Sequence, residues 1–114
     1  MRKILLLLGL VVILASCTSQ KPLYTWEGYD AYSYQYLKKR DSDSRQELLE
    51  TYQKIIDDQD GQRNTVPPGI YADYGFLLIQ DQKTKEGKEM LAKEIENYPE
   101  SEIFITRILK MMER

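Results

Sequence analysis

Few residues in this chain have side chains suited to covalent or acid–base chemistry. Cys17 is the only cysteine among 114 residues, and there is no histidine. A lone cysteine cannot form an intramolecular disulfide, so the protein must be held together by packing. The absence of histidine removes the commonest general base and the commonest nitrogen ligand of metals.

Carboxylates are the remaining candidates for catalysis. Pairs of carboxylates can carry out acid and base chemistry, and Asp57 and Asp73 are examples of the residues available. Nothing in their spacing singles out a pair. The bunched Asp57, Asp58 and Asp60 lack the alternating ligands and distal Glu of a calcium loop. We therefore expect no enzymatic activity, no metal site and no cofactor.

The residues before Cys17 have the layout of a secretory signal. Arg2 and Lys3 precede an apolar run over residues 4–14 that only Gly9 interrupts. At 1.5 Å per residue this run covers about 17 Å, short of the ~30 Å hydrocarbon core of a membrane. We expect residues 1–16 to be a cleaved signal peptide rather than a spanning helix.

The sequence Leu14-Ala15-Ser16-Cys17 that closes this run resembles the lipobox of bacterial lipoproteins. The resemblance implies that Cys17 becomes acylated and is the first residue of the mature protein, which is then bound to a membrane through its lipid. The alternative is a free cysteine beside an ordinary cleavage site. Thr18 stands where the inner-membrane retention signal of enteric bacteria usually has aspartate, so the resemblance favours a periplasm-facing position on the outer membrane.

Length and charge limit what the mature chain can be. Removing residues 1–16 from 114 leaves 98 residues, enough for one small domain, and changes the formal charge from −2 to −4. An acidic chain without a long basic run is a poor ligand for nucleic acid. We expect residues 17–27 to be the lipidated N-terminus and a tether, and residues 28–114 to form a helical domain.

Aromatic residues are concentrated just after the expected tether. Tyr29, Tyr32 and Tyr36 have the spacing of one face of a helix over residues 29–39, and Tyr34 lies off that face. With Trp26 they are a candidate contact surface. Three interpretations stay open: core packing, contact with a partner, and a position at the level of the lipid headgroups.

A second helix is predicted over residues 45–59. Asp41 to Asp43 reads as a turn, Ser44 and Glu47 have the spacing of a capping box, and an apolar stripe follows. Gly61 is the expected terminator. Pro68 is expected in the first turn of the next helix.

The chain from Tyr71 to Pro99 resembles a tetratricopeptide repeat. The matching positions are Tyr71, Tyr74, Gly75, Leu78, Gly87, Leu91 and Pro99. Small residues at Gly75 and Gly87 should let two antiparallel helices approach closely, with Thr84 as N-cap of the second. The pattern usually has a small apolar residue at the position of Glu94 and alanine at the position of Gly87. We expect these two departures to make the second helix less stable, since glycine costs ~1 kcal/mol relative to alanine inside a helix.

A last helix is expected after Pro99, capped by Ser101, with an apolar stripe that closes the stack. The stripe consists of Phe104, Ile105, Ile108, Leu109 and Met112. The predicted fold is thus all-α, a short tetratricopeptide-like stack of helical hairpins with about five helices after the signal peptide.

The repeat resemblance also implies a concave groove. Its lining positions correspond to Ala72, Phe76, Ile79 and Gln80, and three of these four are apolar. An exposed apolar groove in a soluble domain usually marks an interaction site. The alternative is that the first or last helix covers Phe76 and Ile79 as core.

Motifs along the whole chain resemble a family of small bacterial lipoproteins, domain-of-unknown-function family 4810. They are the lipobox, Lys21-Pro22-Leu23-Tyr24 with Trp26, and Val66-Pro67-Pro68-Gly69. Members tend to be encoded beside lipoproteins similar to the curli secretion channel. The resemblance implies a subunit of an outer-membrane lipoprotein assembly, and it supplies no activity and no catalytic residues. Together with the apolar groove, it leads us to expect an envelope adaptor that binds another lipoprotein. The alternative function is a lipoprotein that stacks envelope glycan on its Tyr and Trp residues.

Overall fold

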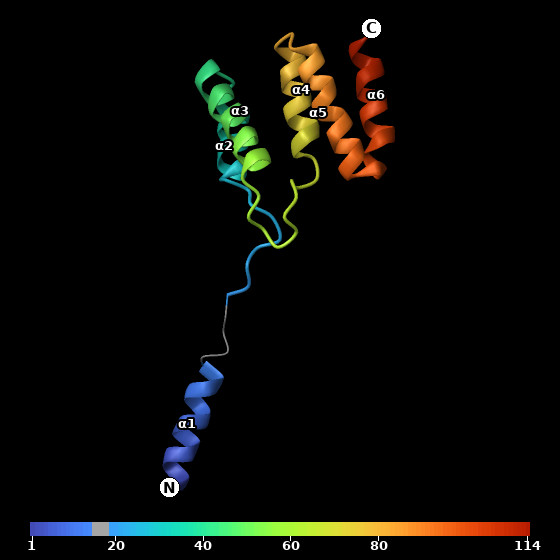
Figure 1. Ribbon diagram of the computed structural model, residues 1–114. Coiled ribbons are helices and arrows are strands. Elements are labelled where there is room, and N and C mark those ends of the chain that lie inside the picture. Colours follow the sequence, from blue (N-terminus) through green and yellow to red (C-terminus); the bar gives the residue numbers. More distant parts are fainter. Residues whose placement is uncertain (15–18) are drawn as a thin grey trace.

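The computed structural model describes residues 1–14 and 19–114, and this part of the chain is helical without strands (Figure 1). Helix α1 spans Arg2–Leu14 and lies apart from the other helices. The domain contains α2 (Tyr29–Lys39), α3 (Ser42–Asp57), α4 (Ile70–Gln80), α5 (Thr84–Asn97), a 3-10 turn (Pro99–Ser101) and α6 (Glu102–Met112). The all-α fold with five helices after the signal segment is confirmed. Cys17 lies outside the described residues.

None of the helices in residues 1–14 and 19–114 has both the length and the apolar character required to cross a membrane.

The core of the domain lies between α3 and α4. Its members are buried apolar side chains that recur at helical spacing: Leu48, Tyr52 and Ile55 from α3, and Ile70, Tyr74, Leu77 and Leu78 from α4. Val66 from the connecting loop joins them. Each helix is apolar on the side that meets the other, so burial of this shared face is the main favourable contribution to folding.

Helices α4 and α5 form the tightest pair, and the cause is a pair of glycines. A Cβ atom added to Gly75 would lie 2.6 Å from the carbonyl oxygen of Gly87, and one added to Gly87 would lie 2.5 Å from the carbonyl oxygen of Gly75. Real Cβ atoms do not approach oxygen so closely. The predicted close approach of the two helices at Gly75 and Gly87 is therefore confirmed.

Helix α3 begins earlier than predicted, because a different residue caps it. Asp41 has extended backbone angles, and its carboxylate accepts a hydrogen bond from the Ser44 backbone N–H at 2.8 Å. Ser44 is buried inside the first turn of the helix. The predicted turn over Asp41 to Asp43 and the cap at Ser44 are wrong, since Asp41 offers the same capping chemistry three residues earlier.

Helix α3 ends at Asp57 rather than Gln59, and Gly61 does not terminate it. Negative charges at a helix C-terminus oppose the helix dipole, which disfavours continuation through the acidic residues that follow. Gly61 has another role. A Cβ there would collide with the backbone of Leu23 and Tyr24, so glycine allows the N-terminal segment to pass directly over the loop.

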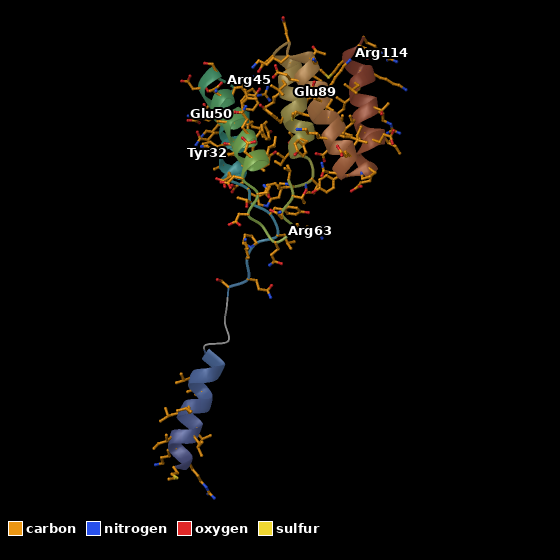
Figure 2. The ribbon with its side chains drawn as sticks, viewed as in Figure 1. Tyr32, Arg45, Glu50, Arg63, Glu89 and Arg114 are labelled. Atoms are coloured by element: carbon orange, nitrogen blue, oxygen red, sulfur yellow. The ribbon has the colours of Figure 1, made fainter. Side chains whose placement is uncertain are left out.

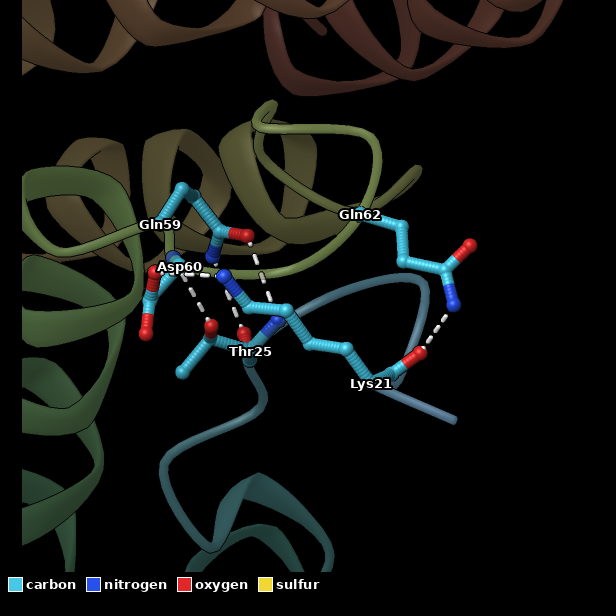
Figure 3. Close-up of polar contacts among 5 residues, drawn as sticks. All are labelled: Lys21, Thr25, Gln59, Asp60 and Gln62. Carbon is cyan, nitrogen blue, oxygen red and sulfur yellow. Dashed lines mark hydrogen bonds and ion pairs between the residues drawn. The ribbon is translucent and has the colours of Figure 1, made fainter. Parts of the chain in front are cut away.

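That N-terminal segment is hydrogen-bonded to the domain (Figure 3). Gln59 accepts from the Thr25 N–H at 3.2 Å and donates to the Thr25 carbonyl at 2.9 Å, and the Thr25 hydroxyl accepts from the Asp60 N–H at 3.0 Å. Lys21 forms an ion pair with Asp60 at 2.8 Å. The Gln62 side-chain amide also donates to the Lys21 carbonyl.

Two backbone bonds complete this attachment, from Gln62 N–H to the Pro22 carbonyl at 2.9 Å and from Arg63 N–H to the Leu23 carbonyl at 3.0 Å. Residues 21–25 thus belong to the folded domain, although the sequence assigns them to a tether. The local sequence there has no periodicity, and partners about 35 to 40 positions away hold it.

The start of α4 is capped from another helix. Gly69 is the N-cap, at a φ of 93° that suits glycine, and Pro68 lies in the turn before the helix, not in its first turn as predicted. The Gly69 N–H donates to Glu94 of α5 at 2.7 Å. Glu94 is 1% exposed, and burial raises the pKa of its carboxyl, while the hydrogen bond from the Gly69 N–H partly offsets that rise. In the described part of the chain its second oxygen, Oε2, is buried without a hydrogen-bond partner.

Glu94 also has a structural role that the repeat pattern does not indicate. A carboxylate at the positive end of a helix satisfies N–H groups that lack partners within the helix. In this chain Glu94 joins α5 to the N-terminus of α4.

The turn between α4 and α5 is held by backbone bonds, not by a side-chain cap at Thr84. Gln82 has a positive φ of 63°, and the Lys83 N–H donates to the Leu78 carbonyl at 2.9 Å. This is the Schellman arrangement, in which the end of the first helix closes on itself. Thr84 is the first residue of α5, and the preceding Lys83 makes no side-chain cap.

Helix α6 lies next to α5 but buries only part of its apolar stripe (Figure 1). Within the stripe Ile105 is 1% exposed, whereas Phe104 is 62% and Met112 is 38% exposed. Ile103 and Met111, which lie outside the stripe, are 67% and 66% exposed. Ser101 makes no capping bond. The prediction that this stripe closes the stack is thus only partly correct, because α6 leaves apolar surface open.

Candidate functional site

Two hollows lie on either side of α4, one toward α2 and the other toward α6. The first lies between α2, α3 and α4 and has a volume of about 260 Å³. Its lining comes from three helices: Tyr29, Ser33, Tyr36, Leu37, Leu48, Tyr52, Asp73, Phe76 and Leu77. The aromatic and aliphatic members predominate, with Asp73 as the charged residue.

The second hollow lies between α4, α5 and α6 and has a volume of about 210 Å³. It is more apolar than the first, and it is lined by Ala72, Asp73, Phe76, Leu91, Phe104, Ile105 and Ile108. Asp73 and Phe76, which are three residues apart on α4, line both hollows. We call this surface, formed by the two hollows and the α4 side chains between them, the groove.

The four predicted groove residues have different positions. Ala72 lines the second hollow, and Phe76 lines both, with its side chain half-buried. Ile79 is also half-buried, but it lines a separate depression with Leu109 and Met112 of α6. Gln80 is exposed near the end of α4 and lines none of these hollows in the described part of the chain.

Asp73 is held at the centre of the groove by a tyrosine. The Tyr29 hydroxyl donates to the Asp73 carboxylate at 3.0 Å, which joins α2 to α4. Asp73 keeps part of its surface in solvent, yet its carboxyl is desolvated enough to raise its pKa, and the bond from Tyr29 partly offsets that rise. Burial and the nearby Asp73 likewise raise the pKa of the Tyr29 hydroxyl.

An arginine holds the walls of the first hollow together. Arg45 of α3 donates to the Tyr36 hydroxyl of α2 at 2.8 Å and to the Leu77 carbonyl of α4 at 3.0 Å. It also pairs with Asp81, just beyond α4, at 2.7 Å. A guanidinium offers several donors in one plane, so Arg45 can join α3 to both α2 and the C-terminal end of α4.

The predicted aromatic surface is divided by the structure. Tyr29 and Tyr36 line the first hollow, Tyr32 is 36% exposed beside Gly28, and Trp26 is 43% exposed in the segment that precedes α2. Tyr34 is 65% exposed and lines neither hollow, which agrees with its predicted position off the face of Tyr29, Tyr32 and Tyr36.

The aromatic rings form a continuous series from the N-terminal segment into the core. Its members in order are Tyr24, Trp26, Tyr29, Tyr52 and Tyr74, with neighbouring ring centroids 5.7 to 6.2 Å apart. Aromatic pairs at this separation stabilise each other beyond simple burial. Core packing therefore accounts for Tyr29, Tyr52 and Tyr74, while Trp26 keeps part of its surface free.

The carboxylates named as catalytic candidates are not brought together. Asp73 pairs with Tyr29 in the groove, whereas Asp57 closes α3. Within residues 1–14 and 19–114, no cluster of three or more acidic, cysteine or histidine side chains has the arrangement to hold a metal ion.

Comparison with known families covers most of this chain. The profile of a domain of unknown function, DUF4810, matches residues 23–108. The chain belongs to the DUF4810 family. The profile of the prokaryotic membrane lipoprotein lipid attachment site matches residues 1–18, a range that includes Cys17, so this DUF4810 protein is a membrane-anchored lipoprotein. No curated protein and no solved structure matches the chain.

The sequence does not indicate the roles of two residues that shape this DUF4810 site. It offers Asp73 only as a carboxylate available for catalysis, and it places Arg45 only at the start of a predicted helix. The signal for Asp73 is its spacing of three from Phe76, which places a charge beside an apolar side chain on one helix face. Arg45 has no comparable signal, because its partners lie beyond its own helix, on α2 and at the C-terminal end of α4.

Proposed function

We propose that this protein is a lipid-anchored, non-enzymatic adaptor of the bacterial envelope whose groove binds another envelope protein. The observation that carries the proposal is Phe76, a large apolar side chain that is only half-buried and separates two mostly apolar hollows. Aromatic residues in such positions commonly supply much of the binding energy of an interface. The charged Asp73 beside it would orient a partner.

We infer that the domain is organised like tetratricopeptide repeats. In this view α2 with α3 and α4 with α5 are two hairpins, and α6 is the first helix of an incomplete third. The close contact between Gly75 and Gly87 supports this assignment, since such repeats place small residues where paired helices cross. The groove then corresponds to the concave surface, because α2, α4 and α6 provide its edges and centre.

The partner we propose is another envelope lipoprotein, of the kind similar to the curli secretion channel. The resemblance of the whole chain to its family supports this choice, and Thr18 supports a position on the outer membrane facing the periplasm. Glycan stacking is the weaker alternative. Trp26 and Tyr29 each have two neighbouring rings at centroid distances of 5.7 to 6.2 Å, which leaves less aromatic surface for a sugar.

A position-specific cross-linking experiment tests the adaptor function. A photo-reactive phenylalanine derivative is placed at Phe76 in the lipidated protein, and at Tyr34 as a control. Tyr34 is aromatic and exposed but lies outside both hollows. After irradiation of cells, the adducts are purified in mild detergent and identified by mass spectrometry.

We expect one envelope protein to be cross-linked from position 76 and not from position 34. The substitution Phe76→Asp should abolish co-purification of the same protein. Circular dichroism should show that the variant retains its helicity. Loss of helicity in Phe76→Asp would mean that Phe76 is a core residue. Equal adducts from both positions would refute the groove as the binding surface.

A further inference from the structure

We propose that the end of the domain formed by residues 21–27 and the loop 58–69 rests on the bilayer surface, with Leu23 and Trp26 in contact with lipid headgroups. This surface, which we call the base, is separate from the groove. In this orientation the base faces the membrane and the groove runs away from the bilayer surface.

The first argument is the length of chain between the lipid and the folded domain. Lys21 is four positions after Cys17. Four extended residues span at most about 14 Å, and the acyl chains of the cysteine must lie in the bilayer. Lys21 can therefore lie no more than about this distance from the level of the headgroups.

The second argument is that this short connection ends at a rigid attachment. The bonds of Thr25 with Gln59 and Asp60, and the ion pair of Lys21 with Asp60, tie the N-terminal segment to the loop after α3 (Figure 3). Gly61 allows this contact because any larger residue would collide with the backbone of Leu23. The anchor thus restrains the base as a whole and not only the first residues.

The third argument is the character of the side chains at the base. Leu23 is 52% exposed and Trp26 is 43% exposed, although both are large and apolar. Tryptophan favours the boundary between lipid and water, where its apolar ring and its N–H group both find suitable surroundings. Lys21 and Arg63 are exposed in the same region, but so are Glu27, Asp58 and Asp60, and Lys21 is paired with Asp60. The contact with the bilayer therefore rests on the apolar side chains and on the lipid anchor, not on net charge.

The opposite end of the domain cannot make the same contact. The longest helix, α3, has 16 residues and is about 24 Å long at 1.5 Å per residue. Arg63 lies at the base and Arg114 at the far end (Figure 2). Helices α2, α4 and α6 all start near the base, so the groove between them runs away from the bilayer (Figure 1).

Fluorescence quenching tests this orientation, because Trp26 is the only tryptophan in the chain. The lipidated protein is reconstituted into vesicles of phosphatidylethanolamine and phosphatidylglycerol. Matched vesicles contain phosphatidylcholine brominated near the headgroup end of its acyl chains. We expect Trp26 emission to be weaker in the brominated vesicles than in the unbrominated ones.

The matched control carries Trp26→Phe together with Met111→Trp, which places the single tryptophan at the far end of the domain. Met111 is 66% exposed, so the change should be tolerated, and circular dichroism checks the fold. We expect no quenching in this variant. Unquenched Trp26 emission, or equal quenching of the two tryptophans, would overturn the proposed orientation, while the cross-linking result for the groove would stand unaffected.

Discussion

The contact between Gly75 and Gly87 offers the sharpest test of the packing. A methyl group on Gly87 would lie 2.5 Å from the Gly75 carbonyl oxygen and 2.5 Å from a side-chain carbon of Ile79. Ordinary contact begins at 3.4 Å, so the two helices would have to separate by 0.9 Å, the difference between 3.4 and 2.5 Å. Since the opposing atom belongs to the backbone of a packed helix, it cannot move aside alone.

Two effects of Gly87→Ala oppose each other. Alanine stabilises a helix interior by about 1 kcal/mol relative to glycine. Overpacking costs about 1–3 kcal/mol, and the rigid contact favours the upper end of that range. We therefore expect a net loss of about 2 kcal/mol in the free energy of unfolding. For a domain of this size that corresponds to a fall in Tm of roughly 8–16 °C.

Thermal and urea unfolding followed by circular dichroism measure this change in the mature chain carrying Cys17→Ser. Ala92→Gly is the matched control, because Ala92 is exposed on the same helix. It should lower stability by about 1 kcal/mol through helix propensity alone. The double variant Gly75→Ala/Gly87→Ala should lose less stability than the sum of the two single variants. Both added methyl groups strain the same helix contact, so the separation of the helices that accommodates one also accommodates the other.

A higher Tm for Gly87→Ala would refute this reasoning, provided that Ala92→Gly still lowers it. In that case propensity would dominate, and the helices could not be as close as the structure places them.

Two further predictions concern contacts between distant parts of the chain. Burial raises the folded pKa of Glu94, so its contribution to stability is fully present below its unfolded pKa and is lost as pH rises through the folded value. The variant Glu94→Gln keeps an acceptor for the Gly69 N–H but cannot titrate. Urea unfolding across a pH series should show that the free energy of unfolding of this variant depends less steeply on pH than that of the wild type. An unchanged slope would argue against Glu94 as the titrating group. Gly61→Ala should release residues 21–25 without unfolding the helices, because its methyl group collides with the backbone of Leu23. Hydrogen exchange should then rise in residues 21–25 while helicity stays the same, and continued protection there would contradict the attachment.

Features that depend on neighbouring residues were accessible from the sequence. The period of apolar residues placed α2 at its observed bounds and the other helices within a few residues, because helix hydrogen bonds and shared faces involve positions three or four apart. The close contact between the helices was also predictable from Gly75 and Gly87, since close packing explains two glycines inside helices. The start of α3 was missed because Asp41 and Ser44 both have capping chemistry, and local pattern alone does not rank them.

The candidate site was only partly accessible in the same way. Ala72 and Phe76 could be placed on one face of α4 by their spacing, and the structure puts both in a hollow. The same spacing placed Ile79 and Gln80 there too, although the turn after α4 and the position of α6 direct them elsewhere. Which side of a helix remains open depends on the neighbours that pack against it.

The sequence by itself determined that this chain is helical, that it carries a lipid attachment site, and where its helices lie. Only the tertiary structure decided that Glu94 caps α4 from 25 residues away, that Thr25 is bound by Gln59, and that α6 leaves apolar surface exposed. Propensity and periodicity act over a few residues. The partner of a buried carboxylate or of a free backbone N–H, in contrast, is set by how whole helices meet in space.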